Sequence, residues 1–399
     1  MKTASTRRGL WLILSVSAAA CLLYGISGGL RANYGVMLGT IAKNSGLDYA
    51  SVSFVLAIGQ LTVGIVQPLF GALALKKSNS FVLALGAVMM AAGLLAVPLC
   101  HSAVSLTLML GIVLSGGTGA MAFGIIMGAI TPAIGEKAAA IASGFVSASV
   151  GIGGTVLSPV IQQLTARFGL RLMMLILCAP IAVLFFISLG LGGSEARYGG
   201  GEEENCISVV RTFREAITDK SYLFIFLAFF TCGYHMSIIE THLYSQYVSY
   251  GFDDALVAFA ISVYGIGAMA GCILTGFLDS RFKNKYVLAG TYWSRLLIAS
   301  ALIFLPKSIP QVYATAFLLG CSGNATVPPT SGLITKLYGS KKLGILFGTA
   351  FLVHQVGAFA SGWLGGILVK GTGGYNLLWI SSMILSLTAG ALAVRVREK

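Results

Sequence analysis

The sequence predicts an all-α membrane protein whose twelve transmembrane helices form two pseudo-symmetric six-helix bundles. Composition is the first observation: of 399 residues, 56% are hydrophobic and 10% are charged, whereas about a quarter of a soluble protein's residues carry charge. The second is a series of twelve long apolar stretches, and the third is a polar insert that divides them six and six. Together these observations exclude a soluble globular protein.

The apolar stretches mark the expected helices, because a helix needs about 20 apolar residues to cross a bilayer. The first six stretches cover residues 10–41, 50–75, 80–100, 104–131, 138–165 and 171–192. The second six cover residues 221–249, 255–278, 285–305, 310–335, 343–369 and 374–394. We therefore expect an N-terminal six-helix bundle in residues 1–192, a cytoplasmic central loop in 193–220, and a C-terminal six-helix bundle in 221–399.

The positive charges indicate how the helices are oriented. With the N-terminus placed inside, nineteen Lys and Arg residues fall on cytoplasmic segments and five fall outside. This asymmetry predicts that both termini and the central loop are cytoplasmic. The net charge of +13 is therefore interpreted as a membrane-surface feature and not as a nucleic-acid interface. We expect a multi-pass, monomeric protein of the inner (plasma) membrane.

The cysteines and the catalytic motifs give negative indications. The seven cysteines lie mostly inside apolar stretches and lack a paired C-x-x-C spacing, so we expect packing residues and neither disulfides nor a zinc site. The sequence contains no phosphate-binding P-loop and no nucleophile beside a base. We expect no enzyme activity, no cofactor and no metal.

The two halves repeat each other in short segments. Gly46-Leu47-Asp48 before the second apolar stretch corresponds to Gly251-Phe252-Asp253, and Gly71 corresponds to Gly276, at a constant spacing of 205 residues. One half of the chain therefore looks like a copy of the other. Parallel six-helix repeats of this kind are a known architecture of transporters.

The loop Gly276-Phe277-Leu278-Asp279-Ser280-Arg281-Phe282-Lys283 resembles the glycine, acid and basic-cluster loop of the major facilitator superfamily. Its counterpart, Gly71-Ala72-Leu73-Ala74-Leu75-Lys76-Lys77, departs from that pattern, because Leu75 stands where the family usually has an acid. The resemblance implies the major facilitator fold. It also implies that Asp279, with Arg281, gates the cytoplasmic face.

Two further segments resemble the monocarboxylate-porter group and its bacterial oxalate/formate antiporter-like members. They are Gly28-Gly29-Leu30-Arg31-Ala32-Asn33-Tyr34-Gly35-Val36-Met37 and Phe351-Leu352-Val353-His354-Gln355-Val356-Gly357. The resemblance implies an organic-anion substrate, with Arg31 and Tyr34 at the binding site. One departure is that no arginine occurs between Ala255 and Leu278, in the eighth stretch, where the porters carry one.

Ionisable groups deep in a bilayer are costly, so those that remain usually face a cavity or a partner. Arg31 lies about 20 Å along its helix from Asn44, and its planar guanidinium suits a carboxylate or phosphate. Glu240, with His235 nearby, lies at the matching depth of the seventh stretch. We expect Glu240 either to pair with Arg31, to take up a coupling proton, or to lie at the outer interface as a helix-end group.

Three more polar residues are candidates for solute contact. Arg295 lies near the middle of the ninth stretch, and His354 with Gln355 lies in the eleventh. For Arg295, bonding to backbone carbonyls is an equal alternative to solute contact. For His354, a histidine with satisfied core hydrogen bonds is the alternative.

These residues favour a secondary carrier that moves a small mono- or dicarboxylate by alternating access, with the proton as a candidate coupling ion. The alternative within transporters is an exporter of drugs or lipophilic cations, which would use Glu240 as a cavity acid. An alternative from another class is a membrane solute sensor that retains a carrier fold.

Overall fold

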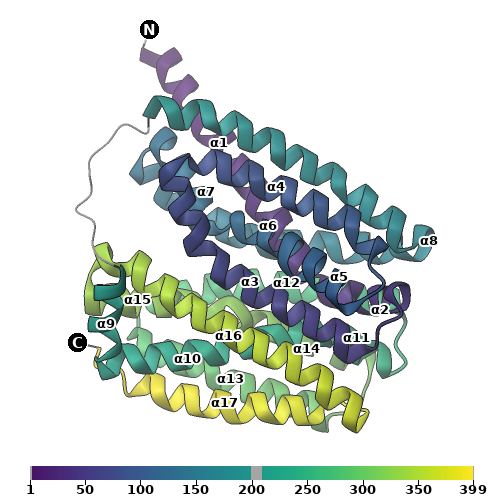
Figure 1. Ribbon diagram of the computed structural model, residues 1–399. Helices are drawn as coiled ribbons and strands as arrows, with labels where there is room; N and C mark the ends of the chain where they lie inside the picture. The colour runs from purple at the N-terminus through teal and green to yellow at the C-terminus, as the bar shows by residue number, and fades with distance from the viewer. Residues whose placement is uncertain (1, 199–208, 399) are drawn as a thin grey trace.

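A computed structural model of the chain describes residues 2–198 and 209–398. Within these residues the regular elements are helices, and no strand occurs (Figure 1). Ten helical stretches of the described residues are long and apolar enough to cross a membrane. The predicted fold class, an all-α membrane protein, is thereby confirmed.

The helices of the first half follow the apolar stretches, with short breaks inside them. Asp48 and Ser78 cap the helices that follow them by accepting hydrogen bonds from the backbone N–H groups of Ser51 and Phe81. The elements are α1 (Lys2–Ala32), α2 (Tyr34–Ser45), α3 (Tyr49–Lys76), α4 (Asn79–Ala96), the 3₁₀ turn η1 (Val97–Leu99), α5 (Ala103–Leu106), the π-helix η2 (Thr107–Leu114), α6 (Ser115–Ala120), α7 (Phe123–Ile134) and α8 (Glu136–Tyr198).

The second half is built in the same way. Asp219, Asp253 and Ser308 cap its helices with their side-chain oxygens. The elements are α9 (Val209–Ile217), α10 (Lys220–Ser237), the π-helix η3 (Ile238–Leu243), α11 (Tyr244–Ser249), α12 (Asp254–Asp279), α13 (Asn284–Phe304), α14 (Ile309–Gly323), the 3₁₀ turn η4 (Asn324–Thr326), α15 (Val327–Tyr338), α16 (Ser340–Thr372) and α17 (Asn376–Val394).

Some of the helices differ in detail from those predicted. The first apolar stretch is broken at Asn33, between α1 and α2. The fifth and sixth stretches share the label α8, but they are two helices separated at Gly169, whose angles φ 70° and ψ 176° are not helical. The 50-residue apolar window of α8, Ala142–Leu191, is long enough for two crossings of about 20 residues each. The tenth stretch is divided by η4, and the count of twelve stays a prediction for these segments.

Left-handed glycines confirm the repeat between the halves. A positive φ strains every residue that has a Cβ, so the positions that need one mark matching turns. Gly46, Gly135 and Gly169 have positive φ in the first half, and the second half has its own at Gly251, Gly339 and Gly373. Corresponding members lie 204 or 205 residues apart.

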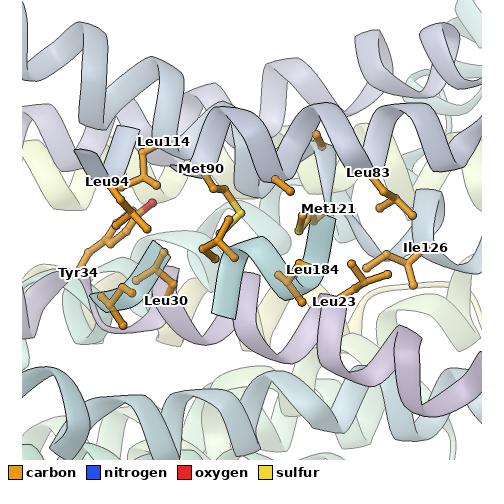
Figure 2. Packing of buried hydrophobic residues seen from close by; sticks show 14 of the residues in the cluster. Leu23, Leu30, Tyr34, Leu83, Met90, Leu94, Leu114, Met121, Ile126 and Leu184 are labelled. Atoms are coloured by element: carbon orange, nitrogen blue, oxygen red, sulfur yellow. The ribbon is translucent and has the colours of Figure 1, made fainter. Parts of the chain in front are cut away.

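The hydrophobic core forms separate clusters in the two halves. One cluster contains buried residues between Val16 and Leu191, including Leu23, Met90 and Leu184 (Figure 2). Two others contain buried residues between Ala216 and Val396. The division into bundles of residues 1–192 and 221–399 stays a prediction that fits these clusters. Cys206 and the acidic run Glu202, Glu203 and Glu204 of the predicted central loop lie outside the described residues, while α9 falls inside the predicted loop.

The halves meet along two repeat-related helix pairs, α3 with α16 and α8 with α12. In the α8–α12 pair, Gly151 and Gly265 approach so closely that a Cβ on Gly151 would lie 3.0 Å from the carbonyl oxygen of Gly265. Ser158 donates a hydrogen bond across this contact to the carbonyl oxygen of Ala258, at 2.8 Å. This pair is therefore held by backbone packing and short polar side chains.

Candidate functional site

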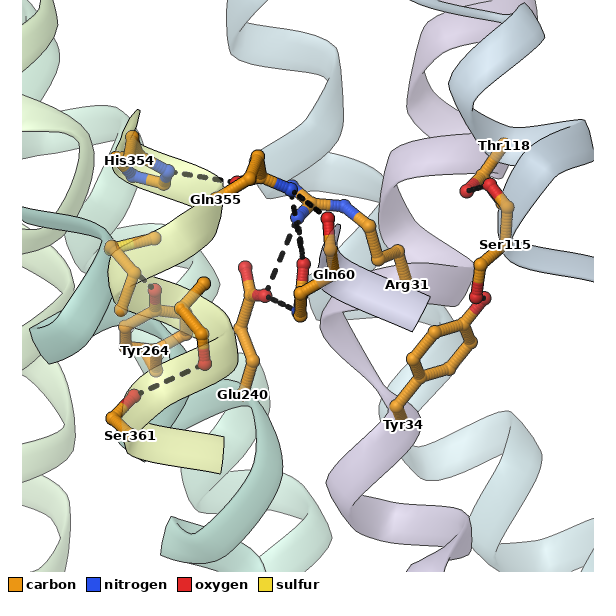
Figure 3. A network of polar contacts seen from close by, with 12 residues as sticks. Arg31, Tyr34, Gln60, Ser115, Thr118, Glu240, Tyr264, His354, Gln355 and Ser361 are labelled. Atoms are coloured by element: carbon orange, nitrogen blue, oxygen red, sulfur yellow. Dashed lines mark hydrogen bonds and ion pairs between the residues drawn. The ribbon is translucent and has the colours of Figure 1, made fainter. Parts of the chain in front are cut away.

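A polar network centred on Arg31 joins the two halves between α3 and α16 (Figure 3). Arg31 lies in the last turn of α1, just before the break at Asn33, whose side-chain amide donates to the carbonyl oxygens of Gly29 and Gly154. Nη1 of Arg31 donates to Oε1 of Gln60 at 2.8 Å. The Arg31 side chain is 21% exposed, so its charge lies inside the molecule without being fully sealed.

Glu240 supplies the negative charge of the network from the other half. It lies in the π-helical segment η3, and its side chain is 7% exposed. Nε2 of Gln60 donates to Oε2 of Glu240 at 2.8 Å, and the same oxygen lies 3.6 Å from Nη1 of Arg31. The expected pairing of Arg31 with Glu240 is therefore present in this structure, with Gln60 as a bridge between the two charged groups.

His354 and Gln355 extend the network along α16. Nε2 of Gln355 donates to the backbone carbonyl oxygen of Gln60 at 2.8 Å, and Nδ1 of His354 donates to Oε1 of Gln355 at 2.8 Å. The His354 ring stacks on Phe351, with ring centroids 5.3 Å apart and planes inclined by 8°. The network thus takes Arg31 and Gln60 from one half and Glu240 and Gln355 from the other.

Tyr34 and Tyr264 flank the network. The hydroxyl of Tyr34 lies 3.4 Å from Oγ of Ser115, on the side of the first half, and Figure 3 shows this pair beyond Arg31. The hydroxyl of Tyr264 donates to Sδ of Met236 at 3.8 Å. Figure 3 shows Tyr264 beside Glu240.

His235 does not join the network. Its Nδ1 lies 2.9 Å from Oγ of Ser382, and its ring packs edge to face on Trp379. His235 lies five positions before Glu240, in α10, whereas Glu240 lies in the π-helical segment η3. The two side chains therefore leave the backbone toward different neighbours.

Arg295 lies apart from the network, in the interior of the second half. Its Nη2 donates to the carbonyl oxygens of Ser322 and Gly323 at 2.8 and 2.9 Å, and Sγ of Cys232 lies 3.5 Å away. The guanidinium lies over the ring of Tyr292. Arg295 is 1% exposed, and its Nε and Nη1 have no hydrogen-bond partner among the described residues. The alternative role for Arg295, bonding to backbone carbonyls, matches these contacts.

The two residues expected to form the gate lie at the end of α12. Oδ1 of Asp279 is buried and has no hydrogen-bond partner in the part of the chain that the structure describes. The guanidinium of Arg281 lies 4.3 Å from the centroid of the Phe277 ring. No bond joins Asp279 to Arg281 in this structure, so a locking partner for Asp279 has to come from another arrangement.

The opposite end of the two halves is tied together. Nζ of Lys370, at the end of α16, donates to Oδ2 of Asp48 at 2.5 Å. The hydroxyl of Tyr49 donates to Nδ1 of His242 at 2.7 Å, and Nε2 of His242 donates to the carbonyl oxygen of Gly362. In the predicted orientation this is the periplasmic end.

Sequence reasoning missed Gln60, the residue that bridges the two charges. A signal was present, because Gln60 is one of two glutamines, with Gln67, in the mainly apolar second stretch. A neutral amide costs less to bury than a charge, and for that reason it attracts less attention.

The network as a whole offers a partly exposed guanidinium, a carboxylate within reach of it, and amides that hold both. Groups of three or more His, Cys, Asp or Glu arranged for a metal were not found in residues 2–198 and 209–398.

Comparison with known proteins identifies relatives across most of the chain. The family model of the Major Facilitator Superfamily matches residues 20–308. An uncharacterized MFS-type transporter of Bacillus subtilis, YcxA, is 24% identical over 341 residues, which are 83% of this chain and 82% of that protein. Monocarboxylate transporter 13 of Rattus norvegicus is 23% identical over 380 residues, covering 93% of this chain and 85% of the relative.

Solved structures show the same fold. The nucleoside transporter NupG superposes with a TM-score of 0.76 at 15% identity, covering 97% of this chain and 99% of that chain. A point mutant of the same transporter gives a TM-score of 0.79 and covers 96% of this chain. At this identity the likeness concerns the fold alone, and it confirms the predicted architecture.

Proposed function

Since the chain belongs to the Major Facilitator Superfamily and is a multi-pass membrane transporter, we propose that it carries a small organic anion, a mono- or dicarboxylate, by secondary active alternating access. The observation that carries the proposal is the partly exposed Arg31, held between side chains from both halves. A guanidinium offers two parallel N–H donors that match a carboxylate. The proposed solute contacts are Arg31, Tyr34, Glu240, His354 and Gln355.

Two lines of support favour an anion over other solutes. Monocarboxylate transporter 13 is among the relatives, although at 23% identity this supports a substrate class and no particular solute. An exporter of lipophilic cations would need a cavity acid free to meet the cation, and Glu240 lies 3.6 Å from Arg31. The remaining candidates, His235 and Arg295, have partners elsewhere, so we give them structural roles.

Proton coupling follows from competition for Arg31. In this structure Glu240 and Gln60 already engage the guanidinium, so an incoming carboxylate has to displace Glu240. A proton on Glu240 removes the competing negative charge and lets Arg31 turn to the solute. One proton would then enter with each monovalent anion, and the pair would cross the membrane without net charge.

The proposed cycle uses the two ends of the molecule in turn. The Asp48–Lys370 and Tyr49–His242 contacts close one end, while Oδ1 of Asp279 at the other end has no hydrogen-bond partner among the described residues. We assign these to the periplasmic and cytoplasmic ends of a monomer in the inner membrane, with both termini cytoplasmic. Asp279 and Arg281 are then expected to gain partners when the cytoplasmic side closes.

Uptake into proteoliposomes tests the proposal, with a panel of radiolabelled organic acids and an imposed proton gradient. Arg31→Gln is expected to lower solute affinity about thirtyfold or more, because removing one partner of a buried charge pair costs on the order of 2 to 5 kcal/mol. Arg31→Lys keeps the charge but loses the planar fork, so it should retain part of the uptake. Arg171→Gln, at an exposed arginine, is the matched control. Unchanged anion affinity in a well-folded Arg31→Gln protein would refute the proposal.

A further inference from the structure

A groove of about 450 Å³ lies on the second half, between α12 and α13, with α14 as its floor. Its lining is mainly apolar, with Leu274 and Leu278 on α12, Ile298 on α13 and Leu318 on α14. Gly290 helps to keep it open, because a Cβ built on this residue meets no atom within 4 Å. The groove is separate from the Arg31 network, and the residue it shares with the proposed function is Arg281 of the expected gate, at its mouth.

The groove follows the membrane-spanning direction. Along α13 it reaches from Tyr286 to Ile298, twelve residues or about 18 Å of helix. One leaflet of a bilayer has a hydrocarbon layer of about 15 Å, so the groove matches the length of a lipid tail. A second transmembrane helix about 10 Å across and 18 Å long would need roughly three times the volume.

Basic and aromatic side chains surround the end of the groove near the membrane surface. Phe282 and Tyr286 line this mouth and are 59% and 56% exposed, as expected of aromatic residues at the headgroup level. Arg281 and Lys283 are exposed beside Phe282, and neither forms an ion pair within the described part of the chain. Asp279 is the nearest acid in the sequence and is partly buried.

We propose that this groove binds one acyl chain of an anionic glycerophospholipid of the cytoplasmic leaflet, with its phosphate held by Arg281 and Lys283. The apolar length fits a lipid tail, and the two unpaired positive charges at the mouth fit a negative headgroup. The cytoplasmic leaflet is the one that carries anionic lipid. The lipid therefore occupies a defined site beside the loop that joins α12 to α13, the loop expected to act in gating.

The test is native mass spectrometry of the purified, delipidated full-length protein, titrated with phosphatidylglycerol and with phosphatidylcholine of the same chains. The wild type is expected to bind one phosphatidylglycerol about tenfold or more tightly than phosphatidylcholine. The double variant Arg281→Gln/Lys283→Gln should lose about fivefold in phosphatidylglycerol affinity for each charge removed, and should lose little for phosphatidylcholine. The matched control is Lys76→Gln/Lys77→Gln, which removes the same charge from the repeat-related loop.

A second variant separates the tail from the headgroup. Gly290→Leu fills the groove and favours the helix, so it should fold and lose affinity for both lipids several-fold. Gly190→Leu, at another glycine with open space around its Cβ position, should leave both affinities unchanged. If Gly290→Leu failed to fold, Ser294→Leu would fill the same groove.

Three results would overturn the proposal. The first is equal affinity of the wild type for the two lipids, and the second is unchanged lipid affinity in Gly290→Leu or Ser294→Leu. The third is a protein dimer that disappears in Gly290→Leu, because the groove would then be occupied by a second copy of the chain. Competition by inorganic phosphate at millimolar concentration would likewise contradict the assignment of a membrane lipid. None of these results bears on the Arg31 proposal.

Discussion

Arg31 and Arg295 are both arginines inside membrane-spanning helices, but their partners differ in kind. Arg31 bonds to the side chains of Gln60 and Glu240, which come from opposite halves. Arg295 bonds to the backbone carbonyls of Ser322 and Gly323 within one half. Side-chain partners from two halves can separate when the halves move, whereas backbone partners within one half stay in place.

The carbonyls that Arg295 contacts explain why it is there. α14 ends at Gly323, so its last carbonyl groups lack the hydrogen bonds that a continuing helix would provide. A cation at a helix C-terminus satisfies these groups and is favoured by the helix dipole. Arg295 therefore stabilises the break between α14 and α15. The difference in partners is the reason that we propose a binding role for Arg31 and a structural role for Arg295.

The largest expected effect comes from Arg295→Gln. Hydrogen bonds to a charged group contribute about 1.5 to 3 kcal/mol each, so losing two at a buried helix end should destabilise the protein by about 3 kcal/mol or more. Melting in detergent, followed by tryptophan fluorescence, should show a clear drop in midpoint and in yield. The affinity of the folded fraction for an established anion should stay within about threefold of wild type.

Arg31→Gln is the matched comparison for that experiment. It should lose anion affinity and should melt closer to the wild-type midpoint than Arg295→Gln does, because Glu240 keeps its hydrogen bond from Gln60. If the two variants exchanged these patterns, so that Arg295→Gln melted normally and bound no anion, the functional assignment would move to Arg295.

Glu240→Gln sharpens the account of Arg31. In the proposed cycle Glu240 takes up one proton when a carboxylate solute binds. The affinity for the solute should therefore fall by up to about tenfold for each unit rise in pH over the range in which Glu240 is ionised. Glutamine keeps the shape but has no proton to exchange, so affinity should become nearly independent of pH and gradient-driven accumulation should stop. Anion affinity measured between pH 5.5 and 8 checks this. A pH dependence that survived in the variant would place the coupling group elsewhere.

Asp279→Asn tests whether the free carboxylate at the end of α12 belongs to the gate. Without its charge the cytoplasmic side should close less readily, so net transport should slow several-fold while equilibrium binding changes by less than about threefold. Spin-label distances across that side, measured with transport and binding on one preparation, separate the two effects. Abolished binding with an unchanged distribution of distances would show that Asp279 acts on the solute site.

Asp48→Asn should have the smallest effect. The hydrogen bond from Lys370 holds the pKa of the Asp48 carboxyl below its usual range, so the pair contributes at neutral pH and is lost only as pH falls through that lowered value. Exposed ion pairs contribute about 1 kcal/mol or less, which limits the change in opening of this end to about fivefold.

The repeat-related Asp253→Asn provides the control for Asp48→Asn. Both aspartates cap a helix, and asparagine caps equally well, but no ion pair to Asp253 occurs among the described residues. Only the Asp48 variant should shift the opening measured by distance labels. Equal shifts in both variants would show that the capping charge matters and the ion pair does not.

Sequence reasoning predicted the fold from apolar length and the repeat, because both are properties of the chain read in order. It could not locate the break at Asn33, since no glycine or proline immediately adjoins it and the apolar run continues to residue 41. It did locate the boundary between the fifth and sixth helices, since Gly169, with its non-helical angles, lies between the predicted stretches 138–165 and 171–192.

The site was only partly predictable for a different reason. Sequence position gives the depth of Arg31 and Arg295 along their helices, but not the direction in which each side chain points. The side chains of Glu240 and His235, five residues apart, point toward different neighbours. The same is true of Arg31 and Arg295. The role of Gln60 depends on the packing of α3 against η3 and α16, which no local pattern records.

The internal repeat has a consequence for the symmetry of recognition. At a spacing of 204 or 205 residues, the positions equivalent to Gln60, Glu240 and Gln355 are Gly265, Gly35 and Gly151. These three polar residues are thus matched by residues with no side chain, and two of the glycines form the close α8–α12 contact. The fold has approximate twofold symmetry, but the polar side chains of the network do not follow this symmetry. A solute bound at Arg31 as proposed would therefore meet amides and a carboxylate on one flank only, and we expect it to bind in a single orientation.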